Sequence, residues 1–64
     1  MSTLLTGYDD SDKRRIATLA ARFVAAAVER GEIELTDEAI RAAMPRAVQD
    51  AREVVNAVNE YLCG

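Results

Sequence analysis

The apolar residues in the C-terminal half of the chain recur at alternating intervals of four and three. Because an α-helix has about 3.6 residues per turn, residues with this spacing line up along one side of a helix. The flanking residues Val48, Val55 and Leu62 widen this apolar stripe. The spacing therefore predicts helical structure whose apolar side packs against other helices. The residues in the alternation are Ile40, Met44, Ala47, Ala51, Val54, Val58 and Tyr61.

Pro45 lies within this stripe. A proline inside a helix removes one backbone hydrogen bond, clashes with the preceding turn and disfavours helical geometry at the residue before it. We therefore expect a short helix over 37–43, a bend at Met44 and Pro45, and a long helix over 45–62. In that long helix Pro45 would occupy the first turn, where proline is tolerated. A continuous kinked helix over the same residues is the alternative.

The N-terminal half predicts one further helix, over 12–30. Asp10, Ser11 and Asp12 are residue types that cap a helix N-terminus, and Gly31 is typical of a helix C-terminus. The stripes of the two helical regions are of similar length, which favours antiparallel packing, and their alanines would let the helix axes approach closely. The apolar positions of this first helix are Ile16, Leu19, Ala20, Phe23, Val24 and Ala27.

The predicted fold is an all-α helical hairpin with a break or kink at Pro45, made of two long helices and a short one. We expect residues 1–10 to form a flexible or partly docked N-terminal arm and residues 11–64 to form a single small helical domain. In the connection between the two helical regions, Ile33 and Leu35 alternate with acidic residues and are expected to turn inward.

Self-association is the expected source of additional stability. A chain of 64 residues buries a smaller fraction of its surface on folding than a larger domain does, so it usually needs further stabilisation. Its only cysteine, Cys63, cannot form an internal disulfide, and without histidine the usual zinc ligand sets are missing. Because two helices cannot cover both apolar stripes, we expect a homodimer that completes a four-helix bundle, with the binding of another protein to the same surface as the alternative. The residues expected at its interface are Phe23, Met44, Ala51, Val54, Val58 and Tyr61.

Acidic residues gather around the connection between the helical regions. A calcium loop would place a glycine among its ligands, but Gly31 precedes most of these acids, so we expect no metal site and no cofactor. A negative surface could instead steer the chain toward a basic surface of a protein partner, and an ordinary solvated turn is the alternative. The residues of this acidic turn are Glu29, Glu32, Glu34, Asp37 and Glu38.

Basic residues cluster at the start of the first helix, where the positive end of the helix dipole favours an anion. They form the alternative anion-binding set. The neighbouring Asp9, Asp10 and Asp12 can neutralise them, and the net charge of −3 opposes affinity for phosphate, so nucleic-acid binding is not the expected function. The basic residues are Lys13, Arg14, Arg15 and Arg22.

The sequence offers no catalytic constellation, because it has no histidine and its single thiol is the penultimate residue. We therefore expect no enzymatic activity. It shows no signal peptide and no membrane span, which predicts a cytoplasmic location and no membrane partner, and its alanine and arginine usage suggests a bacterial or phage source. The predicted function is that of a small acidic helical module that regulates or inhibits a protein partner by occluding its surface. The alternatives are anion or nucleic-acid binding and a purely structural, self-assembling subunit.

Overall fold

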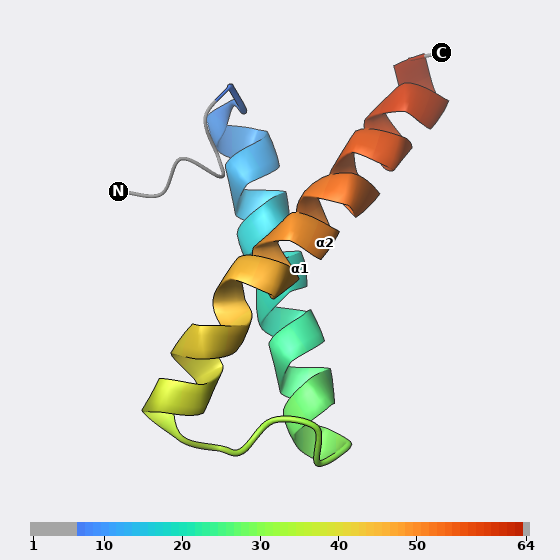
Figure 1. Ribbon diagram of the computed structural model, residues 1–64. Helices are drawn as coiled ribbons and strands as arrows, with labels where there is room; N and C mark the ends of the chain where they lie inside the picture. The colour runs from blue at the N-terminus through green and yellow to red at the C-terminus, as the bar shows by residue number, and fades with distance from the viewer. Residues whose placement is uncertain (1–6, 64) are drawn as a thin grey trace.

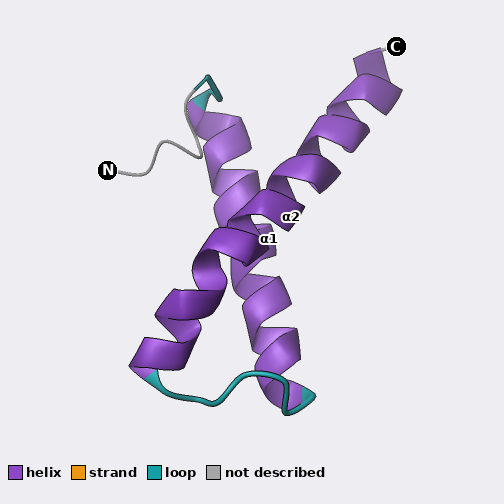
Figure 2. Ribbon diagram, viewed as in Figure 1, coloured by secondary structure: helices purple, strands orange, loops and turns teal. Residues whose placement is uncertain are grey.

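A computed structural model describes residues 7–63 as two helices joined by a short connection (Figure 1). Helix α1 spans Asp10–Glu29 and helix α2 spans Asp37–Cys63. The described residues contain no strand, and only helix and loop are coloured in Figure 2. The prediction of an all-α hairpin is confirmed. Residues 1–6 of the predicted arm lie outside the described part of the chain.

Helix α1 is capped at both ends. The side chain of Asp9 accepts a hydrogen bond from the backbone N–H of Asp12 at 2.8 Å. At the other end, the backbone N–H of Glu32 donates to the carbonyl oxygen of Ala27 at 2.9 Å, and Gly31 between them has a φ of +77°. This is a Schellman motif, which needs a left-handed residue directly after the helix and therefore favours glycine. The glycine that the sequence places after the first helix thus ends it.

Helix α2 is a single helix that passes through Pro45, in place of the expected short helix over 37–43 and long helix over 45–62. The hydroxyl oxygen of Thr36 caps its N-terminus by accepting a backbone N–H three residues later, at 3.2 Å. Pro45 removes the hydrogen bond to the carbonyl of Arg41, but both residues are exposed, so water can reach that carbonyl. Residues on both sides of Pro45 pack into the same core, which keeps the two halves in one helix.

The core lies where the two helices cross. Within each helix, the buried residues of this cluster are four positions apart. Ridges of residues four apart interlock at a steep crossing angle of about 50°, whereas heptad packing gives about 20°. The helices accordingly form an X, and they diverge on both sides of the crossing (Figure 1). The buried residues are Ile16, Ala20 and Val24 of α1 and Ala47, Ala51 and Val55 of α2.

The buried side of α2 departs from the predicted alternation after Ala51. The next buried residue is Val55, whereas Val54 is 40% exposed, Val58 is 46% exposed and Tyr61 is 87% exposed. The four-residue ridge and the heptad stripe both include Ala51. The stripe continues to Val54 and the ridge to Val55, and these two side chains point about 100° apart around the helix. The C-terminal half of α2 therefore carries apolar side chains that α1 does not cover.

Candidate protein-binding surfaces

The residues predicted for self-association are divided between the core and the surface. Ala51 is fully buried at the crossing, and Phe23 and Met44 are half-buried against the core, so these residues serve packing within the chain. The remaining ones project from the C-terminal half of α2, where they are joined by Leu62. We call this set the exposed face of α2, and it consists of Val54, Val58, Tyr61 and Leu62.

A groove runs between α1 and the exposed face of α2, on the side of the crossing away from the connection (Figure 1). Its α1 wall is rich in arginine and its α2 wall is made largely of valine. The structure thus brings together residues that the sequence assigned to two separate sites, one for anion binding and one for self-association. We call it the amphipathic groove, and its lining includes Arg14, Arg15, Leu19, Arg22, Val54 and Val58.

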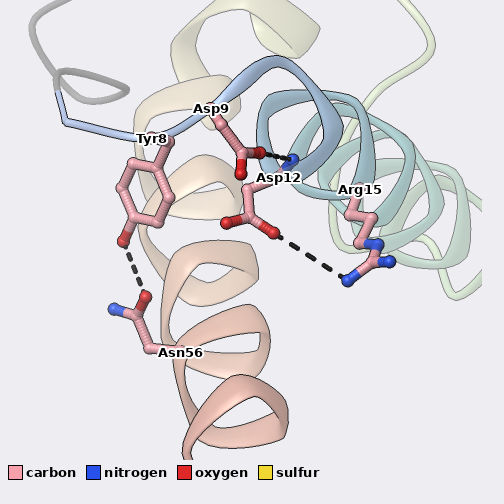
Figure 3. A network of polar contacts seen from close by, with 5 residues as sticks. All are labelled: Tyr8, Asp9, Asp12, Arg15 and Asn56. Atoms are coloured by element: carbon pink, nitrogen blue, oxygen red, sulfur yellow. Dashed lines mark hydrogen bonds and ion pairs between the residues drawn. The ribbon is translucent and has the colours of Figure 1, made fainter. Parts of the chain in front are cut away.

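The arginine wall of the groove keeps most of its positive charge unpaired. Arg15 Nη1 lies 3.9 Å from Asp12 Oδ1 (Figure 3). This pair is long and its arginine is exposed, so it contributes little. Within residues 7–63, Lys13, Arg14 and Arg22 form no ion pair, and Lys13 does not line the groove. The groove therefore suits a ligand that combines apolar groups with carboxylates.

Tyr8 ties the start of the described chain to α2 outside this groove. Its hydroxyl donates to Asn56 Oδ1 at 3.0 Å (Figure 3), and the guanidinium of Arg52 lies 5.8 Å from the centre of its ring. Within residues 7–63 the Arg52 Nε atom is buried without a hydrogen-bond partner. The sequence predicts a flexible or partly docked arm over residues 1–10, but nothing in it identifies a partner for Tyr8 forty-eight positions away.

The acidic turn is partly neutralised by local arginines. Arg30 Nε donates to Glu32 Oε2 at 2.6 Å, and Arg41 Nε donates to Asp37 Oδ2 at 2.8 Å. The hydrogen bond and the charge of Arg30 lower the pKa of Glu32, and Glu32 in turn raises the pKa of Arg30. These pairs are exposed, so they change the charge pattern of the turn more than its stability.

The other acids of the turn surround an exposed leucine. Leu35 is 78% exposed, whereas the sequence predicted that it would turn inward as Ile33 does. The backbone N–H of Thr36 donates to the carbonyl of Glu34 at 2.9 Å, which closes a tight turn at Leu35 and directs it away from the core. Strand-like alternation cannot reveal such a turn.

Leu35 also borders a second, mostly apolar groove that includes Val28, Ile40 and Met44. Within residues 7–63 the surrounding glutamates form no ion pair, so the turn presents an apolar side chain inside a negative rim. We call this region the acidic loop surface, and it consists of Leu35 with Glu29, Glu34 and Glu38.

In the part of the chain that the structure describes, no group of three or more acidic or thiol side chains is placed to hold a metal ion. Neither described helix is long and apolar enough to cross a membrane. No family model matches the chain, and no curated protein or solved structure gives a match either. Two surfaces are therefore the basis for a functional proposal: the acidic loop surface, and the amphipathic groove together with the exposed face of α2 that borders it.

Proposed function

We propose that this chain is a small protein-interaction module that regulates or inhibits a partner protein by covering part of its surface. The acidic loop surface is the proposed contact with that partner. The observation that carries the proposal is the position of Leu35, which is 78% exposed, directly follows Glu34 in the chain and lines the same groove as Glu29. Within residues 7–63 neither of these glutamates, nor Glu38, forms an ion pair. A large apolar side chain at the centre of a charged rim is the arrangement in which a few anchor residues provide most of the binding energy.

The charge of the rim defines the chemistry of the partner. Glutamates that form no ion pair within residues 7–63 can attract a basic surface and increase the rate of its association. The partner should therefore carry an apolar pocket for Leu35, bordered by lysine or arginine. The groove beside Leu35, which includes Ile40 and Met44, extends the apolar area available to it.

A photo-crosslinking amino acid at position 35 tests this proposal in cells that express the chain. We expect a defined protein to be captured through position 35 and not through Ala17, an exposed α1 position outside both surfaces. Capture should be lost when Glu29, Glu34 and Glu38 are changed to glutamine, while circular dichroism shows unchanged helix content. Equal crosslinking at both positions, or capture that survives the glutamine changes, would contradict the proposal.

The proposal includes a homodimer formed through the exposed face of α2, which completes a four-helix bundle. Among residues 7–62, four of the seven buried residues, including Ala27 outside the cluster at the crossing, are alanines, and Ile16 is the only large side chain that is fully buried. Such a core removes little apolar surface from water, so covering Val54, Val58, Tyr61 and Leu62 would add substantial stability. A purely structural subunit remains the alternative, and assemblies larger than a dimer in light scattering would favour it.

The variant Val58→Asp should weaken the dimer without unfolding the single chain, so it distinguishes dimerisation from folding. Because Val58 is 46% exposed in the hairpin, an aspartate there should leave α1 and α2 folded. In the dimer it would bury an unpaired charge, and we expect the dissociation constant to rise by at least about tenfold. Light scattering over a concentration series measures this, and Ala17→Asp is the matched exposed control. Loss of helical signal in Val58→Asp alone would contradict the assignment of this face.

Anion binding by the basic residues of α1 is less well supported than protein binding. The wall that faces Arg15 and Arg22 across the groove is formed by three valines and Asn59, so it offers a phosphate a single amide group and is otherwise apolar. A phosphate backbone would also meet a chain with a net charge of −3.

A further inference from the structure

We infer that the amphipathic groove is occupied by helix α2 of a second copy of this chain, in a dimer whose two α2 helices run parallel. This inference rests on the dimer in the proposed function and specifies its geometry. The exposed face of α2 supplies the apolar groups for such a contact, and the glutamates that flank it supply the carboxylates for Arg15 and Arg22 of the other copy.

Acidic side chains lie on the side of α2 that faces away from its own α1. Successive residues of a helix are about 100° apart, so Val54 lies between its neighbours Val55 and Glu53. Val55 is buried against α1, Val54 borders the groove and Glu53 is exposed. Glu60, seven residues after Glu53, is also exposed and lies on the same side. Each α2 therefore carries an acidic flank that points away from its own α1.

The basic edge of α1 has a spacing that matches this acidic flank. Arg15 and Arg22 both line the groove and are also seven residues apart. Seven residues correspond to about 10 Å along a helix, so the two arginines and the two glutamates have matched spacing. Both pairs could form at once between two copies. Glu53 and Glu60 have no ion pair within the described residues, so they are available for this contact.

Symmetry then selects the orientation of the two α2 helices. A two-fold axis that relates parallel α2 helices places the two α1 helices on opposite sides of the α2 pair. The acidic flank of each α2 then faces the basic edge of the other copy's α1. With antiparallel α2 helices, both α1 helices lie on the same side, so their arginines approach each other and the acidic flanks remain together on the far side. Electrostatics therefore favours the parallel dimer.

Charge exchange tests the contact between the acidic flank and the basic edge. The variant Arg15→Glu/Arg22→Glu and the variant Glu53→Arg/Glu60→Arg should each dimerise at least about tenfold more weakly than the natural chain, because like charges would face each other. Mixed together, the two variants should form a heterodimer, since every contact then pairs opposite charges. Raising the salt concentration should weaken this heterodimer. Analytical ultracentrifugation of each variant and of the mixture measures these affinities.

Cys63 tests the orientation, because it is the last residue of α2. In a parallel dimer the two Cys63 residues lie at the same end, so mild oxidation or a short bifunctional maleimide should link the natural chains, and Cys63→Ser should abolish the link. An antiparallel dimer would separate them by the length of the contact and leave the chains unlinked.

The possible failures can be told apart. If the natural chain dimerises, the charge variants could still dimerise equally well, or Cys63 could fail to link the two copies. Either result would overturn the groove geometry but not the dimer itself. A chain that stays monomeric in light scattering at all concentrations would overturn both. The crosslinking experiment at Leu35 tests the partner contact separately, because Leu35 lies outside the amphipathic groove.

Discussion

Replacing Ile16 by alanine should lower the free energy of unfolding by about 2–5 kcal/mol, which is enough to unfold most of a chain this small. Of the residues that the structure describes, Ile16 is the only one with a large side chain that is completely buried, and it belongs to the same cluster as the alanines of the crossing. Those small neighbours cannot move in to fill the space that the substitution leaves. Urea unfolding followed by far-UV circular dichroism, at one fixed chain concentration, measures the change.

Ile40→Ala is the matched control, because it removes the same atoms from a residue that is only partly buried. We expect its effect to be clearly smaller than that of Ile16→Ala. Equal losses for both variants would mean that the crossing is not the centre of stability and that packing is distributed along the hairpin.

Replacing Pro45 by alanine should raise the free energy of unfolding by about 1–3 kcal/mol. The substitution restores the backbone hydrogen bond to the carbonyl of Arg41 and removes the clash of the ring with the preceding turn. Since Pro45 is exposed inside α2, no core contact is lost. For a domain of this size, each kcal/mol corresponds to a shift of about 4–8 °C in the midpoint of thermal unfolding.

Arg46→Ala is the control for that experiment. Arg46 is the exposed neighbour of Pro45, and its Nε atom lies 3.5 Å from Asp50 Oδ1 in an exposed ion pair, so we expect a change below about 0.5 kcal/mol. If Pro45→Ala instead lowers the midpoint, the proline must shape α2 so that its two halves reach α1, and a bend at this residue would be part of the fold.

Local signals in the sequence were sufficient to predict the two helices. Gly31 ends α1 as predicted, whereas the N-cap of α1 is Asp9, directly before the predicted capping residues Asp10, Ser11 and Asp12. Thr36 caps the start of α2 through a contact within three residues. Helix capping depends on residue type and short-range geometry, so it can be read from the chain directly. Pro45 was misleading as a helix break, because the cost of a proline depends on whether tertiary packing holds its two sides together.

The crossing could not be predicted from the spacing of apolar residues alone. A heptad stripe and a four-residue ridge both pass through Ala51, and only the partner helix decides whether Val54 or Val55 follows it into the core. This one choice determines which valines are exposed. The same choice brings the arginines of α1 and the valines of α2 together in one groove. The sequence therefore identified these residues but not that they lie in one site.

The acidic turn shows the same limit at shorter range. Its carboxylates are plain in the sequence, and the pair of Arg41 with Asp37 has ordinary helical spacing. The direction of Leu35 depends on a single backbone hydrogen bond between Thr36 and Glu34, which no pattern of residue types specifies. The centre of the proposed contact was therefore assigned to the interior.

We expect the crossing to act as a pivot, because three of the six buried residues of its cluster are alanines. Alanine faces lack the long interlocking side chains that would hold the angle between two helices, so a small rotation changes few contacts there and moves the far ends most. A second copy that widens or narrows the groove would thereby alter the spread of the helices at the connection. Dimerisation and binding at the acidic loop surface should then be thermodynamically linked, each changing the affinity of the other by the same factor.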